Sequence, residues 1–282
     1  MGERKVKATE ESVGEVIALS TAQPDKRRVR RWIKRFNWRG IVSVTGFILL
    51  WEFLARTKTP GFETIPTVLE VLETLWTNYL PAVEYWQSWL VSFKRVAYGF
   101  VISQVLGIPL GLLLGTREKF HELVFPVIEI LRPIPPLAWV PLSILFWPTN
   151  EMSIVFITFV GAFFIIVINV HDGVRSIKKE HLWLARSLGA TSGRIFRRII
   201  LPAVIPSIAV GMTIGIAVTW NVVIAAEMIA SDVGLGRLTW EGYVSNTPVV
   251  VIIGMMSIGL AGYLSTLVVT YAEKKMMPWR QR

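Results

Sequence analysis

The side chains best placed to do chemistry lie in a charged stretch, residues 182–208, between two long apolar segments. Its charges are positive and come from Arg186, Arg194, Arg197 and Arg198. Arginine offers a fork of N–H donors for anions and carboxylates but supplies no nucleophile or base. In membrane proteins, loops rich in arginine and lysine accumulate on the cytoplasmic side. The stretch therefore predicts a cytoplasmic loop that binds a partner.

The spacing within this stretch predicts a helix-turn-helix hook, residues 177–201. Gly189 favours a left-handed end to a helix over residues 177–188, and Thr191 or Ser192 caps the helix that follows. Pro202 marks the point at which this second helix gives way to the next span. The second helix carries Ile195, Phe196, Ile199 and Ile200 on one side and Arg194, Arg197 and Arg198 on the other. Such a helix holds either a partner protein or anionic lipid head groups.

Composition places the chain in a membrane. Of its 282 residues, 52% are hydrophobic, and several apolar runs reach the roughly 20 residues that cross a bilayer. The net charge of +10 is spread over the two ends and the loops, which indicates topology and not a nucleic-acid surface. The chain has no cysteine, so disulfides and thiolate chemistry are excluded. His121, His171 and His181 lack ligand spacing, and we expect no metal site and no enzyme active site.

Six apolar segments predict an all-α, polytopic membrane protein with about six transmembrane helices, at residues 40–55, 93–115, 123–147, 152–170, 203–229 and 248–271. The predicted parts are a basic N-terminal tail (1–39), a first span with an external segment (40–89), a core that includes the hook (90–273), and a C-terminal tail (274–282). Both tails are basic, which places both termini in the cytoplasm. Residues 67–79 are the clearest amphipathic helix of the external segment.

The third apolar segment contains a dense group of prolines, Pro133, Pro135, Pro136 and Pro141. Prolines at this density break a helix. A broken backbone at membrane depth is tolerated only where it is buried in protein or lines a cavity. We therefore expect this segment to line a cavity.

Charged side chains inside the predicted spans need partners. Lys94 and Arg95, near the external end of the second span, are expected to extend toward water or to meet an acidic partner. Glu227, in the fifth span, is expected to pair with a cation or with backbone donors. Glu129 and Arg132 lie three residues apart, and the simplest role for them is a mutual ion pair.

The spacing of the hook is more specific than its charge. Ala185, three residues, Gly189, nine residues, Ile199, one residue and Leu201-Pro202 resemble the signature loop of the membrane subunits of ATP-binding-cassette (ABC) importers, which runs Glu-Ala-Ala, three residues, Gly, nine residues, Ile-x-Leu-Pro. The sequence departs from that pattern at Trp183 and Leu184, where Glu and Ala are usual.

Further motifs, in order along the chain, are similar to the taurine and alkanesulfonate permeases, in the branch that also contains nitrate, nitrite and bicarbonate permeases. They are residues 131–142, 225–229 (Ala-Ala-Glu-Met-Ile), 234–236 (Gly-Leu-Gly) and 278–280 (Pro-Trp-Arg). The Pro-Ile-Pro-Pro stretch and the Pro-Trp-Arg end are closer to the sulfonate members. The resemblance implies import of a small anion, with taurine or an alkanesulfonate first and nitrate, nitrite or bicarbonate as the alternative.

The resemblance also implies partners. In this family two permease subunits pair, two ATP-binding subunits dock beneath them, and an external solute-binding protein delivers the substrate. The chain contains no Walker loop, so ATP and Mg are expected in the partner subunit and no cofactor in this chain. The expected location is the cytoplasmic membrane, where the chain also contacts membrane lipid.

Residues carried over by the resemblance fall into two sets. Contact with the ATP-binding subunit is expected from Ala185, Arg186, Ser187, Leu188, Gly189, Ala190, Arg194, Ile199, Leu201 and Pro202. For an anion the path needs donors and positive potential but no tight site, and the candidates are Arg132, Pro135, Trp139, Trp220 and Asn221. The alternative role for the two tryptophans is helix packing or anchoring.

A different class, an ion-coupled secondary transporter or a channel, stays open. Such proteins carry membrane-embedded carboxylates or broken helices in repeated halves. The sequence shows no internal repeat. Dependence of transport on an ATP-binding subunit would distinguish the two classes.

Overall fold

The computed structural model describes residues 38–58 and 63–277, and helices are the only regular structure in these two ranges. The chain divides into two compact units, Met1–Glu63 and Thr64–Arg282. In the described part of the first unit, α3 (Trp38–Thr57) is a helix of 20 residues, long and apolar enough to cross a membrane. It confirms a helix at the first predicted span. Most of the predicted N-terminal tail and the end of the C-terminal tail lie outside the described residues.

The second unit begins with two short helical segments, which are followed by a long helix. α4 (Val68–Thr74) and the π-type turn η1 (Leu75–Tyr79) occupy the predicted amphipathic segment, and the Thr67 hydroxyl accepts a bond from the Glu70 N–H (3.2 Å). α5 (Val83–Thr116) has 34 residues and is therefore about 51 Å long, more than the roughly 30 Å of hydrocarbon in a bilayer. It starts well before the predicted residue 93, so part of the expected external loop is helix.

The third predicted span is broken, as expected from its prolines. α6 (Glu118–Leu131) ends before them, a 3₁₀ turn η2 (Pro136–Trp139) follows, and α7 (Val140–Phe146) leaves at 89° to α6. The arrangement is a broken span or a re-entrant loop. In either case the chain changes direction at the predicted place.

Close packing joins α5 to α8 (Asn150–Arg175) and α8 to α11 (Leu201–Ala230). Glycines on α5 permit the first contact, since a Cβ at Gly99 would lie 2.6 Å from Thr158 Cγ2 and one at Gly115 would lie 2.4 Å from Val174 Cβ. A buried cluster with members on α5, α8 and α11 fills the space between these helices, including Phe100, Ile157 and Val223.

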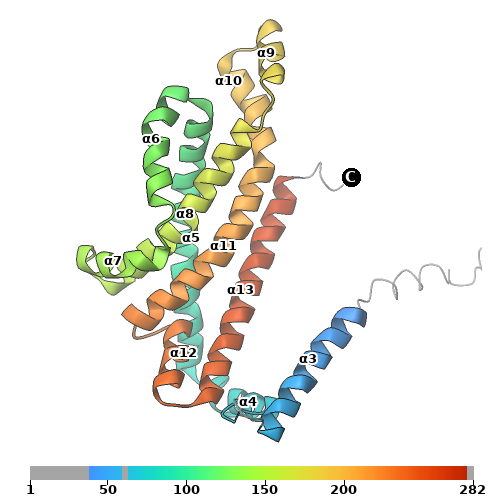
Figure 1. The fold of residues 1–282 in the computed structure, drawn as a ribbon, viewed down its shortest axis with the longest axis vertical. Coiled ribbons are helices and arrows are strands. Elements are labelled where there is room, and N and C mark those ends of the chain that lie inside the picture. The colour runs from blue at the N-terminus through green and yellow to red at the C-terminus, as the bar shows by residue number, and fades with distance from the viewer. Residues whose placement is uncertain (1–37, 59–62, 278–282) are drawn as a thin grey trace, which may run out of the picture. The chain divides into compact units, whose positions relative to one another are not determined.

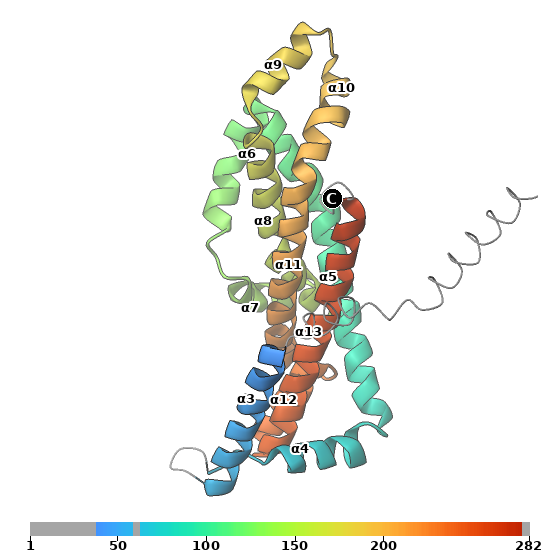
Figure 2. The same cartoon turned by 90° about the vertical axis from the view of Figure 1, so that its right-hand side faces the viewer.

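Two more helices complete the second unit. α12 (Leu235–Val244) packs on α13 (Pro248–Met276), and both contact α11. α9 (Lys179–Ser187) and α10 (Ser192–Ile195) lie at one end of this unit, and α4 and α12 lie at the other (Figures 1 and 2). Among the described residues five helices are long and apolar enough to span a membrane, or six with the bent α6–α7 pair. The prediction of an all-α protein with about six spans is confirmed, but α12 was not predicted from the sequence.

Candidate functional site

The hook projects past the neighbouring helices at one end of the second unit (Figure 1). α9 ends in a Schellman motif in which Gly189 adopts a φ of 77°. The Gly189 N–H donates to the Arg186 carbonyl (2.9 Å), and the Ala190 N–H donates to the Ala185 carbonyl (3.0 Å). These bonds satisfy carbonyls that the end of α9 leaves free, and they confirm the left-handed turn predicted from Gly189.

The second helix of the hook differs from the prediction at its far end. α10 begins after Thr191, although the Thr191 side chain makes no capping hydrogen bond. It continues through the π-type turn η3 (Phe196–Ile200) into α11, so that Ser192–Ala230 is one helix of 39 residues. The prediction that Pro202 ends it was wrong. In a regular α-helix a proline ring clashes with the carbonyl four residues earlier, and the π-type turn η3 immediately before Leu201 interrupts that regular pattern.

The surface of the hook combines charge with exposed apolar side chains. Ile195 is buried, and the predicted arginines Arg194, Arg197 and Arg198 are exposed on the other side. The tip and the first helix also expose Trp183, Leu184 and Leu188, with 59%, 62% and 79% of their surface accessible. Large apolar groups exposed together at a protruding tip are typical of a protein contact. The sequence had marked Trp183 and Leu184 only as departures from a family pattern.

The broken segment holds three of the predicted path residues, Arg132, Pro135 and Trp139. Arg132 and Pro135 are exposed, and Arg132 forms the C-cap of α6. Among the ion pairs of the described residues there is none between Glu129 and Arg132, so their predicted pairing was wrong, and Arg132 is free of that carboxylate. The indole N–H of Trp139 is buried and has no hydrogen-bond partner, while its ring packs edge-on against Phe156.

The other two predicted path residues, Trp220 and Asn221, are neighbours on α11 with different surroundings. Trp220 is only 4% exposed; its indole N–H donates to the Ser265 hydroxyl (3.0 Å) and its ring meets Phe93 edge-on at 5.3 Å. These contacts are those of a packing residue. Asn221 is exposed.

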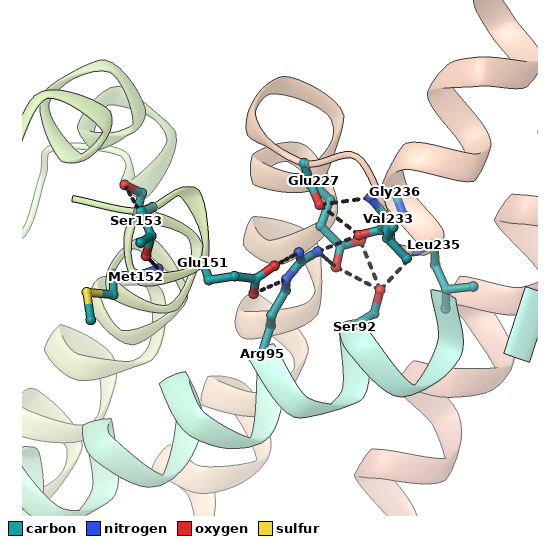
Figure 3. Close-up of polar contacts among 11 residues, drawn as sticks. Ser92, Arg95, Glu151, Met152, Ser153, Glu227, Val233, Leu235 and Gly236 are labelled. Atoms are coloured by element: carbon teal, nitrogen blue, oxygen red, sulfur yellow. Dashed lines mark hydrogen bonds and ion pairs between the residues drawn. The ribbon is translucent and has the colours of Figure 1, made fainter. Parts of the chain in front are cut away.

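A polar network built around Arg95 lies in the half of the second unit that holds α12, and the sequence predicted only its parts (Figure 3). Arg95 on α5 is 3% exposed and extends between Glu151, at the start of α8, and Glu227, near the end of α11. Its Nε donates to Glu151 (2.9 Å) and a terminal nitrogen donates to the other oxygen of the same carboxylate. The remaining terminal nitrogen donates to Glu227 (2.8 Å) and to the Val233 carbonyl (2.8 Å). For Lys94 and Arg95 we expected either extension toward water or an acidic partner, and for Arg95 the acidic partner is confirmed.

Glu227 is fully buried and accepts hydrogen bonds from three residues, two on α5 and one at the start of α12. Besides Arg95, the Ser92 hydroxyl donates to both carboxylate oxygens (2.7 and 2.9 Å), and the Gly236 N–H donates at 2.9 Å. Glycine is required at the turn into α12, because a Cβ at Gly234 would lie 2.5 Å from the Glu227 carboxyl and one at Gly236 would lie 2.4 Å from the Ile224 carbonyl. The predicted pairing of Glu227 with a cation and backbone donors is confirmed.

A cavity of about 290 Å³, with several polar residues in its lining, opens where η1, the start of α5 and α12 meet. Its lining includes Tyr79, Arg237 and Glu241. Burial, followed by the charge of Glu241, raises the pKa of Tyr79 above its usual value. Among the described residues no group of three or more His, Asp or Glu side chains is placed to hold a metal ion.

Comparison with known proteins decides the family. Residues 107–278, more than half of the chain, match the family model described as binding-protein-dependent transport system inner membrane component. The chain belongs to this family. It is a permease subunit of an ABC importer, and the matched region includes the hook, the broken segment and most of the helical core.

Relatives of this permease support the branch that its motifs indicated. The protein MJ0413 of Methanocaldococcus jannaschii is 38% identical over 237 residues, 83% of this chain and 89% of the relative. The bicarbonate transport system permease protein CmpB of Synechococcus elongatus is 30% identical over 273 residues, 91% of this chain and 98% of the relative. The nitrate import permease protein NrtB of Leptolyngbya laminosa is 32% identical over 247 residues, 85% of this chain and 88% of the relative.

Solved structures support the fold. An inward-facing structure of the MetNI methionine ABC transporter aligns with a TM-score of 0.52 at 21% identity, covering 71% of this permease and 97% of that chain. A bacterial ABC transporter that imports the acidic polysaccharide alginate aligns with a TM-score of 0.55 at 12% identity, covering 96% and 99%. At these identities the likeness concerns the fold alone.

Proposed function

We propose that this permease subunit carries a small oxyanion into the cell and takes its energy from ATP hydrolysed in separate subunits. The structure of the hook is the main support for this proposal. The hook is a helix-turn-helix with exposed apolar and basic side chains that projects beyond the neighbouring helices and continues into α11. A rigid, protruding element of this kind transmits the movement of a partner to the helices that continue from it.

The hook is the proposed contact with the ATP-binding subunit. Arg186 and Leu188 lie at the exposed end of α9, and Arg194 lies on the exposed side of α10. The remaining contact residues predicted from the motif are Ala185, Ser187, Gly189, Ala190, Ile199, Leu201 and Pro202. ATP and Mg bind in the partner subunit, and this chain holds the helices that the partner moves. Since α10 is continuous with α11, a push on the hook acts directly on a membrane span.

The proposed orientation places the hook and both termini in the cytoplasm. The hook carries positive charge without acidic residues between Leu182 and Pro202, as expected for a cytoplasmic loop. The end of the bundle with α4 and α12 then faces outward, where a solute-binding protein delivers the anion. A second permease subunit, which we take to be a copy of this chain, completes the path.

The broken segment is the proposed part of the path that meets the anion. Arg132 has no ion-pair partner on its own helix, so its positive charge can attract an anion. The indole N–H of Trp139 has no hydrogen-bond partner and can donate a hydrogen bond to the anion. Exposed Asn221 is a further donor. We withdraw Trp220 from the path because its N–H already has a partner in Ser265.

The short sequence motifs and the similarity over the whole chain favour different substrates. The Pro-Ile-Pro-Pro stretch and the Pro-Trp-Arg end favour taurine or an alkanesulfonate, and that prediction stays untested. The relatives named as bicarbonate and nitrate permeases cover most of the chain at 30% and 32% identity. We give more weight to resemblance over the whole chain than to two short motifs, and we place bicarbonate or nitrate first.

Competition for uptake tests this proposal. Vesicles would contain the permease with its ATP-binding subunits and its solute-binding protein. Uptake of labelled bicarbonate, nitrate and taurine would be measured, each with and without the other anions and an alkanesulfonate as competitors. We expect bicarbonate or nitrate to be taken up and the sulfonates not to compete. Uptake of a sulfonate alone would reverse the choice of substrate, and uptake of no small anion would contradict the proposed function.

A further inference from the structure

The two carboxylates that share Arg95 are held very differently. The Glu151 side chain is 63% exposed, whereas the Glu227 side chain is 0% exposed. Glu227 also accepts bonds from Ser92 and from the Gly236 N–H, but in this network Arg95 is the one donor to the Glu151 carboxylate. When its ion pair opens, an exposed carboxylate such as Glu151 is hydrated by water, whereas a buried carboxylate with further hydrogen bonds is costly to separate from its partner. The bond from Arg95 to Glu151 is therefore easier to release than the bond to Glu227.

The surroundings of Glu151 leave room for movement. A largely apolar cavity of about 600 Å³ and a more polar cavity of about 560 Å³ share four lining residues, namely Val91, Lys94, Arg95 and Glu151. The Arg95–Glu151 ion pair thus lies where the two cavities meet, and the exposed Glu151 carboxylate has open space beside it although Arg95 is buried. Separating this pair requires little repacking.

The start of α8 is tied to the broken segment. The Ser153 hydroxyl in the first turn of α8 donates to the Ser143 carbonyl in α7 (3.0 Å), so this turn and α7 form one corner. On its other side α7 is separated from α6 by the break, with the 89° change of direction. The corner can therefore move relative to α6 without bending α6. On its other side it is continuous with the rest of α8, so it moves only when α8 tilts or bends, and the bond between Glu151 and Arg95 opposes that movement.

We propose that Arg95 is a positioning residue with a permanent bond on one side and a releasable bond on the other. Its bonds to Glu227 keep α5 joined to α11 and to the start of α12 throughout the transport cycle. Its bonds to Glu151 break when the corner of α7 and α8 moves away from α5. The movement carries the broken segment with it at the outward-facing end of the permease. This inference rests on the proposed function, because the cycle that moves the corner is the one driven by ATP.

Distances between spin labels test this inference. The sequence has no cysteine, so labels attach only where cysteines are introduced. Leu90→Cys on α5 with Met152→Cys on α8 reports the releasable bond, and Leu90→Cys with Ile229→Cys on α11 reports the permanent one; all three side chains are exposed. Labelled permease is diluted with unlabelled chain in the full complex, so that most complexes carry one labelled copy. Each pair is measured with and without a non-hydrolysable ATP analogue.

We expect a longer Leu90 to Met152 distance in one nucleotide state and a constant Leu90 to Ile229 distance. Glu151→Gln keeps the shape of the side chain but removes its charge, so it should raise the long-distance population several-fold in both states. The control Glu241→Gln, in an exposed pair with Arg237, should leave both distances as in the wild type. A merely structural role for Glu151 would not move this distribution.

Two results would overturn the inference. One is a single Leu90 to Met152 distance that is the same in both nucleotide states and in Glu151→Gln. The other is an equal change in both label pairs, which would mean that the bond to Glu227 is not permanent. ATP-dependent uptake is measured on the same vesicles, and uptake that persists with unchanged distances would refute the role of Arg95 while the proposed function stands.

Discussion

Glu227 shows how much one buried residue can determine. Its carboxylate accepts bonds from α5 through Ser92 and Arg95 and from the start of α12 through Gly236, and it is fully buried. A buried carboxylate needs such donors, since desolvation of the charge is otherwise uncompensated. The bonds join the consecutive helices α11 and α12 to α5, which lies more than 100 residues earlier in the sequence, so they form only in the folded chain.

Glu227→Gln should destabilise the permease by about 3 kcal/mol, because the amide presents N–H groups to donors and leaves the charge of Arg95 without its buried partner. Thermal unfolding in detergent measures the change. Glu241→Gln is the matched control: its pair with Arg237 is exposed, and we expect a change within about 0.5 kcal/mol. Equal melting temperatures for the two variants would show that the Glu227 network does not stabilise the fold.

The two tryptophans of the predicted path give a second test at this scale. Trp139→Phe keeps a ring against Phe156 and removes an N–H that has no partner, so we expect unchanged stability and a KM for the anion raised several-fold. Trp220→Phe loses the bond to Ser265 and should cost about 1 kcal/mol in stability. Uptake kinetics and thermal unfolding of both variants check this. If Trp139→Phe lowered stability and left KM unchanged, Trp139 would not belong to the path.

Single residues were predictable from the sequence only in part. Glu227 needed donors because a carboxylate in an apolar span always does, and that requirement was met. Which donors it would find was not predictable, since Ser92 and Gly236 come from helices whose packing the sequence alone does not give. Glu129 and Arg132 lie three apart, yet do not pair, because Arg132 falls at the end of α6 where the chain turns away.

At the scale of elements, the hook depends on the conformation of Gly189. With a φ of 77°, alanine there would be strained although nothing lies within 4 Å of its Cβ. Gly189→Ala should therefore distort the turn at a cost of about 1 kcal/mol and lower ATP-dependent uptake several-fold, with membrane insertion unchanged. Gly193 also has open space but lies inside α10, so Gly193→Ala should be neutral. Equal uptake by the two variants would contradict the importance of the turn.

The break between α6 and α7 is the second element with a direct test. Replacing Pro133, Pro135 and Pro136 together with alanine removes the restraints that end α6 and allows one continuous helix. We expect at least a tenfold loss of uptake with normal insertion. Pro126→Ala, at a proline inside α6 that does not break the helix, is the control and should retain uptake. Full uptake by the triple variant would show that transport does not need the break.

Long apolar runs and dense prolines made the spans and the broken segment predictable, because bilayer thickness and the missing proline N–H act locally. Pro202 led to a wrong prediction of a helix end, because the helix continues past it after the π-type turn at Phe196–Ile200. α12 was missed because its ten residues are too few and too mixed to stand out, and its start depends on the turn over Glu227.

At the scale of the whole molecule, the second unit of this permease has the hook at one end, the polar network toward the other and the broken segment along one side of its core. α11 connects two of them, since it continues from the hook and carries Glu227 near its far end. A movement of the hook therefore reaches the network through one continuous helix. This connection is the physical basis for coupling ATP hydrolysis to the path.

The most direct test of the central claim is uptake of labelled bicarbonate and nitrate into vesicles that contain the permease and the solute-binding protein, with and without the ATP-binding subunits. We predict that uptake requires those subunits and ATP on the side of the hook, and that Gly189→Ala lowers it. Uptake that proceeds without the ATP-binding subunits, driven by an ion gradient, would contradict the account and identify a secondary transporter.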